Sequence, residues 1–125
     1  MSDMPCKIVL VDDDPEFATG LAEVLTREGH EVDVFGTPEA AFEWLLGGGR
    51  AGLVLLDLHT PGMSAQRFRA LQMSAPALHD LSIVVVSGEP TIHAIATSLD
   101  ASDALEKPVD VARLLETVKR HCRVA

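Results

Sequence analysis

The sequence predicts an α/β domain built on a parallel sheet with helices on both faces. Two observations support this fold class. Five short apolar runs alternate along the chain with five segments that have helical periodicity, and several of the runs stop abruptly at a polar residue. Each parallel crossover needs a long, right-handed connection, so such alternation gives a sheet whose strands all point the same way.

The individual elements follow from local patterns. The β-branched run before Asp12 is typical of a strand buried on both faces. Asp14 before Pro15 is typical of a helix N-cap, with proline at the first helical position. The expected strands are Lys7–Val11, Glu31–Phe35 (half-buried), Leu53–Leu56, Ser82–Val86 and a short Ala104–Leu105. The expected helices run from Pro15 to near Gly29, from Thr37-Pro38 to Gly47–Gly49, around Phe68 and Leu71, from about Thr91 to Leu99, and from Val111 to Cys122.

Length and charge limit the possible functions. We expect residues 1–125 to form a single domain, because a chain of this size buries roughly two-thirds of its unfolded surface. Its net charge of −9 argues against binding of nucleic acid or anionic membranes. No apolar run approaches the roughly 20 residues of a membrane span, and the first residues do not resemble a signal peptide. We therefore expect a cytoplasmic domain.

The two cysteines, Cys6 and Cys122, lie near opposite ends of the sequence and lack the spacing of a paired-cysteine metal site. We expect two reduced thiols, with a disulfide as the alternative. Four of the five histidines, His30, His79, His93 and His121, also lack the spacing of metal ligands and are expected at the surface.

Polar residues with complementary chemistry follow four of the expected strands. In parallel sheets, ligands bind outside the carboxyl ends of the strands. Those ends carry Asp12 and Asp13, then Asp57, Ser87 and Lys107. Carboxylates crowded on one edge resist ionising together unless a hard cation relieves the repulsion, and Mg²⁺ suits such oxygen ligands. The pattern indicates a magnesium-binding carboxylate site.

The same residues suit phosphoryl chemistry. A free carboxylate beside the cation can attack phosphorus and form an aspartyl phosphate. Lys107 could pair with one phosphoryl oxygen and Ser87 could donate to another. Taken singly, Asp57 could be a solvated loop acid and Asp14 is expected merely to cap a helix. The placement of the site residues after four different strands supports the functional interpretation.

These stretches resemble the receiver domain of two-component response regulators over nearly the whole chain. The matching segments, in order, are Ile8–Asp14, Leu55–Leu58 with Pro61–Met63, Val84–Gly88 and Leu105–Pro108. The resemblance implies the doubly wound flavodoxin-like (CheY-like) sheet of five strands in the order 2-1-3-4-5, with five helices.

The resemblance also implies site roles and partners. Asp57 would accept a phosphoryl group from a histidine kinase or histidine phosphotransfer protein. Asp12, Asp13, Asp57 and the backbone carbonyl of His59 would hold Mg²⁺, while Ser87 and Lys107 would bind the phosphoryl oxygens. The bond before Pro108 would be cis.

Some positions depart from the family pattern. The usual Tyr or Phe three residues before the lysine is Ala104, the stretch from Ser87 to Lys107 is slightly shorter than usual, and the chain has no Tyr. We therefore expect an atypical output face. His59 and Glu89 stand where the family flanks the path of the hydrolytic water, so either they tune phosphoryl lifetime or they are solvated loop residues.

Two other functions fit parts of the sequence. A haloacid-dehalogenase-type enzyme would use the pair Asp12 and Asp14, with the phosphoryl group on Asp12, but it leaves Asp57 unexplained and leaves no room for a cap domain. A pseudo-receiver would keep the fold as a binding module without phosphorylation. The intact acid set argues against it, whereas Ala104 keeps it open. The sequence names neither the kinase nor the output partner.

Overall fold

The computed structural model describes residues 5–123. The predicted domain boundaries, residues 1 and 125, lie outside this part. A five-stranded sheet in the order β2-β1-β3-β4-β5, parallel throughout, forms the centre of the molecule. Both the fold class and the strand order are as expected. The strands are β1 (Lys7–Val11), β2 (Glu31–Phe35), β3 (Leu53–Asp57), β4 (Ser82–Ser87) and β5 (Asp103–Glu106).

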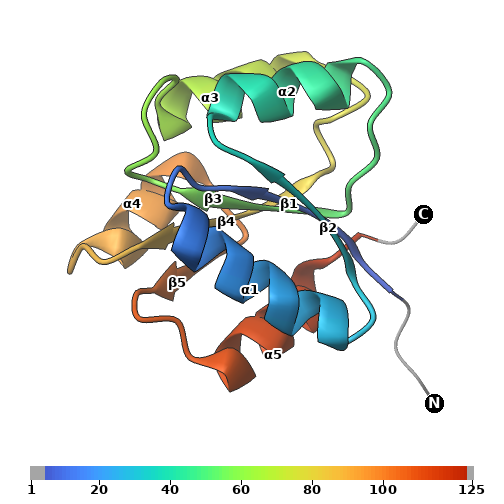
Figure 1. Cartoon of the computed structure of the whole chain (residues 1–125). Coiled ribbons are helices and arrows are strands. Elements are labelled where there is room, and N and C mark those ends of the chain that lie inside the picture. Colours follow the sequence, from blue (N-terminus) through green and yellow to red (C-terminus); the bar gives the residue numbers. More distant parts are fainter. Residues whose placement is uncertain (1–4, 124–125) are drawn as a thin grey trace.

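Five helices cover the two faces of this sheet (Figure 1). One face carries α1 and α5 and the other α2 and α3, with α4 packed on the same face as these last two. The helices are α1 (Pro15–Arg27), α2 (Pro38–Leu46), α3 (Ala65–Ser74), α4 (Ile92–Leu99) and α5 (Val111–His121).

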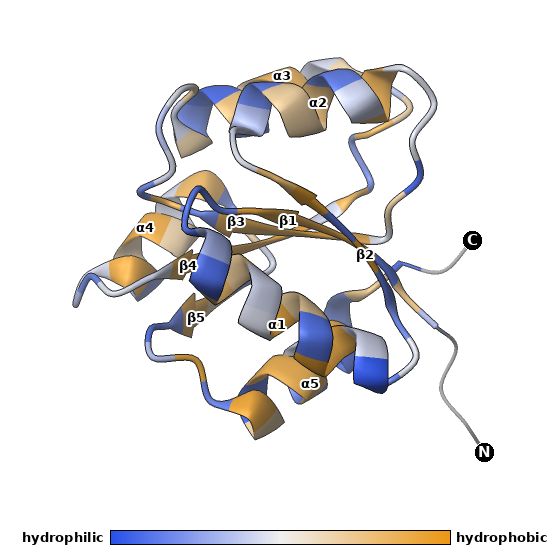
Figure 2. Ribbon diagram, viewed as in Figure 1, coloured by the Kyte–Doolittle hydropathy of each residue, from blue (hydrophilic) through white to orange (hydrophobic). Residues whose placement is uncertain are grey.

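The core is divided into two apolar layers because neighbouring residues of a strand point to opposite faces. On β1, Val9 and Val11 belong to the layer that α2, α3 and α4 cover, whereas Ile8 and Leu10 belong to the layer that α1 and α5 cover. The central strands β1 and β3 are hydrophobic along most of their length (Figure 2). The edge strand β2 is more exposed than its alternating pattern predicts, because none of its five residues is buried and the apolar Val34 is 46% exposed.

Most element boundaries match the expected ones within a residue or two. The Asp14 carboxylate accepts the Glu16 and Phe17 amides, which confirms the predicted N-cap. The helix expected from Thr91 begins at Ile92, and its C-cap Asp100 takes a left-handed backbone with φ of 54°. The peptide bond before Pro108 is cis, as the resemblance implies.

The expectation of two reduced thiols is wrong for this structure. Cys6 and Cys122 form a disulfide, with their Cα atoms 6.1 Å apart although 116 residues separate them in sequence. The sheet brings the start of β1 beside the end of α5, and sequence distance carries no information about this proximity. Two of the four histidines expected at the surface, His30 and His121, are half-buried rather than exposed.

Among the described residues, no helix is both long enough and apolar enough to cross a bilayer.

A buried amide holds α3 against the segment that leads into β4. Gln72 is 1% exposed, and its side-chain nitrogen donates to the carbonyls of Leu78 and Leu81 at 2.9 and 2.8 Å. Its oxygen accepts from Arg69, whose guanidinium also donates to the Leu99 carbonyl at the end of α4. One polar cluster therefore joins α3, α4 and the start of β4.

We expect Gln72→Leu to lower the free energy of unfolding by about 1–3 kcal/mol, because the buried Leu81 carbonyl loses its side-chain donor. Chemical denaturation of the purified domain measures this loss. Gln66→Leu on the exposed side of the same helix is the matched control and should have little effect. Equal effects of the two substitutions would show that the buried amide is not a stabilising link.

Candidate functional site

The site lies at the carboxyl edge of the sheet, where β1, β3, β4 and β5 end. Asp12 directly follows β1, Asp57 is the last residue of β3, and both are buried, at 3% and 6% exposure. Asp13 is exposed on the turn that leads into α1. Each of the three offers a carboxylate oxygen, and these oxygens lie within 4.8 Å of one another. The strand ends therefore gather the three acids that the sequence predicts.

Lys107 supplies a positive charge to this acidic cluster. Its Nζ lies 3.4 Å from Asp12 Oδ2 and 3.4 Å from Asp57 Oδ2. The backbone amide of Lys107 donates to the Ser87 carbonyl, which aligns the residue beside the end of β4. The ammonium also lies 4.2 Å from the centroid of the Phe17 ring, in a cation–π contact. The sequence analysis did not single out Phe17, because an aromatic residue early in a helix carries no local sign of this contact.

Backbone donors orient the two buried carboxylates. Asp12 Oδ1 accepts the Asp14 amide at 2.9 Å, and Asp57 Oδ1 accepts the His59 amide at 3.1 Å. Each acid thus has one oxygen held by its own loop and the other facing Lys107. This division keeps both buried carboxylates beside Lys107 instead of turned toward solvent.

Burial raises the pKa of Asp12 above its ordinary value of 3.8, and the nearby Asp57 carboxylate adds to the effect. The hydrogen bond from the Asp14 amide and the charge of Lys107 act in the opposite direction but do not cancel it. The folded protein therefore ionises Asp12 at a net cost.

Ser87 is fully buried at the end of β4, where its Oγ accepts the Glu89 amide at 3.0 Å. Since the hydroxyl oxygen is the acceptor in this bond, its proton stays available for another group. Thr60, a residue that the sequence analysis did not single out, has a buried Oγ1 without a partner among the described residues. It lies on the loop after Asp57, and no motif in the sequence marks it.

Two predicted tuning residues contact each other across the rim of the site. His59 Nε2 lies 3.3 Å from Glu89 Oε1, although the two residues belong to the loops after β3 and β4. Their side chains are 60% and 41% exposed. The contact joins the two loops that border Asp57.

Ala104 lies on β5 and is 3% exposed. It belongs to the apolar layer that includes Ile92, Ala96 and Leu99 of α4. The small side chain thus packs under α4, at the position where the resemblance implies an aromatic ring.

Comparison with known proteins agrees with this geometry. The sequence model of the family described as the response regulator receiver domain matches residues 8–119. This chain therefore belongs to the family of response regulator receiver domains.

Individual relatives and solved structures extend the comparison. The chain is 32% identical to the cyclic di-GMP phosphodiesterase response regulator RpfG of Xanthomonas campestris, over 86% of this chain and 29% of that protein. It is 30% identical to the DNA-binding transcriptional regulator NtrC of Rhizobium meliloti, over 90% of this chain and 23% of that protein. A response regulator receiver protein from Pseudomonas putida superposes with a TM-score of 0.81 at 27% identity, covering 94% of this chain and 98% of that one. The chain thus spans less than a third of the length of either of these two curated relatives.

The raised pKa of Asp12 predicts how stability depends on pH when no metal is present. The folded protein keeps the Asp12 proton to higher pH than the unfolded chain does, so the free energy of unfolding should fall as pH rises from about 3.8 through the raised pKa. Asp12→Asn should lack the part of this fall in unfolding free energy that comes from Asp12. The variant should therefore be more stable than the wild type at neutral pH. Urea unfolding in a chelating buffer across this range measures both curves.

The two curves should meet below pH 3.8, where Asp12 is protonated in both folded and unfolded wild type. Curves that stay parallel over the whole range would contradict the assigned cost of ionising Asp12.

Proposed function

We propose that this domain accepts a phosphoryl group on Asp57 from a histidine kinase or histidine phosphotransfer protein, in a Mg²⁺-dependent reaction that switches an output surface. The observation that carries this proposal is the convergence of Asp12, Asp13, Asp57 and Lys107 at one sheet edge. Family membership supports it, because receiver domains are signalling domains.

The donor set fits Mg²⁺. Three carboxylate oxygens within 4.8 Å of one another offer the hard ligands that this ion prefers, and the cost of ionising Asp12 is relieved by a nearby cation. We assign Asp12, Asp13, Asp57 and the backbone carbonyl of His59 as the ligands. When bound, the ion would supply the positive charge that lets phosphoryl oxygens approach a cluster of carboxylates.

The chain's own groups would then carry the transfer. An Asp57 carboxylate oxygen forms a bond to phosphorus, while the bond from phosphorus to the donor's imidazole nitrogen breaks and leaves its electron pair on that nitrogen. Lys107, already beside Asp57 Oδ2, pairs with one phosphoryl oxygen. Ser87 donates its free hydroxyl proton to another. Both groups stabilise charge that moves from the donor onto the new acyl phosphate.

The dehalogenase-type alternative has less support from the geometry. That reaction would need Asp12 as nucleophile and Asp14 as its partner acid. Asp14 Oδ1 instead accepts the Glu16 and Phe17 amides as the helix cap. Asp12 Oδ1 is held by the Asp14 amide. A pseudo-receiver stays the second candidate, because Ala104 lacks the aromatic ring of the usual output relay.

We further propose that this domain catalyses nothing beyond its own phosphorylation and dephosphorylation, and that it works in the cytoplasm without contacting nucleic acid or membrane. The net charge of −9 supports the last part. The enzymatic and DNA-binding activities named for RpfG and NtrC belong to proteins more than three times as long as this chain. The output partner of this domain is therefore not inferred from them.

Incubation with acetyl phosphate and Mg²⁺ should add the mass of one phosphoryl group to the wild-type protein, and Asp57→Asn should abolish this adduct. Intact-mass analysis measures both, with a chelated sample to test the metal requirement. Asp80→Asn, whose side chain is 94% exposed, is the matched control and should be phosphorylated normally. An adduct that persists in Asp57→Asn would favour Asp12 as nucleophile, and no adduct on wild type would favour the pseudo-receiver.

If His59 and Glu89 control access of water to the acyl phosphate, then His59→Ala and Glu89→Ala should each change the dephosphorylation rate by severalfold. The double variant should change it little further, because the two side chains act as one contact. Decay of the phosphorylated protein, followed by intact mass, gives the rates. Rates equal to the wild-type rate would identify both residues as solvated loop residues without a tuning role.

A further inference from the structure

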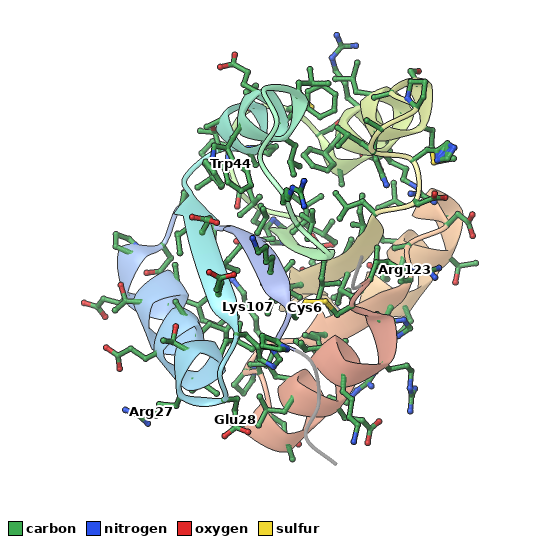
Figure 3. The ribbon with its side chains drawn as sticks, turned by 90° about the vertical axis from the view of Figure 1, so that its right-hand side faces the viewer. Cys6, Arg27, Glu28, Trp44, Lys107 and Arg123 are labelled. Carbon is green, nitrogen blue, oxygen red and sulfur yellow. A yellow bond between two sulfur atoms is a disulfide. The ribbon has the colours of Figure 1, made fainter. Side chains whose placement is uncertain are left out.

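The disulfide lies at the end of the sheet opposite the phosphoryl site. Cys6 immediately precedes β1 and Cys122 immediately follows α5, so the bond joins the start of the first strand to the end of the last helix (Figure 3). Asp12 and Asp57 stand at the other ends of β1 and β3. Nothing in the proposed phosphoryl transfer uses either sulfur.

The two sulfurs have different surroundings. Cys6 is 1% exposed, whereas Cys122 is only partly buried, so an attacking thiol can approach the bond from the Cys122 side. The Sγ of Cys6 lies 3.7 Å from the Lys7 carbonyl oxygen. A thiol proton on Cys6 would therefore have an acceptor after reduction.

The segment around Cys122 is packed closely against the sheet. The Arg123 amide donates to the Gly52 carbonyl at 2.9 Å, and the Gly52 amide donates to the Lys7 carbonyl at 2.7 Å. A Cβ at residue 52 would collide with the Arg123 carbonyl oxygen and with Cys122 Sγ. The end of α5 is thus held by one covalent bond and by a short ladder of backbone hydrogen bonds.

We propose that Cys6 and Cys122 form a redox-reversible modification site that controls how firmly the end of α5 is held against β1. In reducing compartments disulfides are rare, and those that occur are mostly transient, catalytic or redox-sensing. A disulfide with one approachable sulfur, and with a hydrogen-bond acceptor beside the buried one, suits that use. The domain would then receive a thiol-disulfide input in addition to, and independent of, the phosphoryl input at Asp57.

Reduction of the disulfide by thiol–disulfide exchange requires a protein dithiol as the reductant. A thiolate of the dithiol attacks Cys122 Sγ, the bond between the two sulfurs breaks, and Cys6 leaves as a thiolate that takes up a proton. The second thiol of the reductant then attacks the mixed disulfide and releases Cys122, which is protonated in turn. The protein gains two electrons and two protons, and the dithiol becomes a disulfide. A low-molecular-weight disulfide such as oxidised glutathione reverses the process.

The experiment treats the native wild-type domain with thioredoxin and its recycling system, and afterwards with oxidised glutathione, without denaturant. Alkylation followed by intact mass counts the free thiols at each stage. We expect complete, reversible interconversion of two thiols and one disulfide. Reduction should lower the Tm by on the order of 10 °C, because the bond closes a loop of nearly the whole chain. Amide exchange at Cys122 and Arg123 should rise about tenfold while β3 stays protected.

Cys122→Ser is the matched variant, since it keeps the buried Cys6 and should be insensitive to both reagents in Tm and in amide exchange. If this variant does not fold, the thiol count and exchange of the wild type decide the question alone. A disulfide that resists thioredoxin until the protein unfolds would overturn the proposal in favour of a static link, and thiols that never oxidise would overturn it in favour of two free cysteines. Phosphorylation by acetyl phosphate is measured separately on each redox form, so failure of the phosphoryl proposal stays distinguishable.

Discussion

The balance of charge at the carboxyl edge of the sheet is the constraint around which this domain is organised. Two carboxylates, Asp12 and Asp57, are buried there because they end central strands, and burying a charge without compensation is costly. Lys107 lies 3.4 Å from both carboxylates and offsets part of this cost, and it is itself positioned by the edge of β4 and the ring of Phe17. The ends of β1, β3, β4 and β5 and the start of α1 must therefore come together before the site exists, so its chemistry depends on the intact fold.

Much of the fold could be predicted from the sequence because parallel strands impose strong rules. Apolar runs that alternate with helical segments permit few arrangements, and the polar residue after each run must lie at the shared edge. For that reason Asp12, Asp57 and Lys107 could be named as neighbours although up to 95 residues separate them. The N-cap at Asp14 could be predicted equally well, since the preference for Asp before Pro at the start of a helix depends only on neighbouring residues.

Other contacts could not be predicted, because they depend on how loops and side chains meet across the folded molecule. The pairing of Cys6 with Cys122 requires knowing that α5 ends beside the start of β1. The contact between His59 and Glu89 requires the conformations of two loops, and each residue alone has the pattern of a solvated side chain. Likewise, Gln72 has no sequence signature that separates a buried amide from the exposed ones usual on helices.

The disulfide has a further consequence for the connectivity of the molecule. Because it joins residue 6 to residue 122, almost the entire chain forms a covalent ring. A protease that cuts once in any exposed loop of that ring opens it without releasing a fragment, so a nicked molecule keeps its mass apart from one added water. Its two pieces separate only when the cysteines are reduced. A molecule of this domain can thus have a cut backbone and still be held together by covalent bonds.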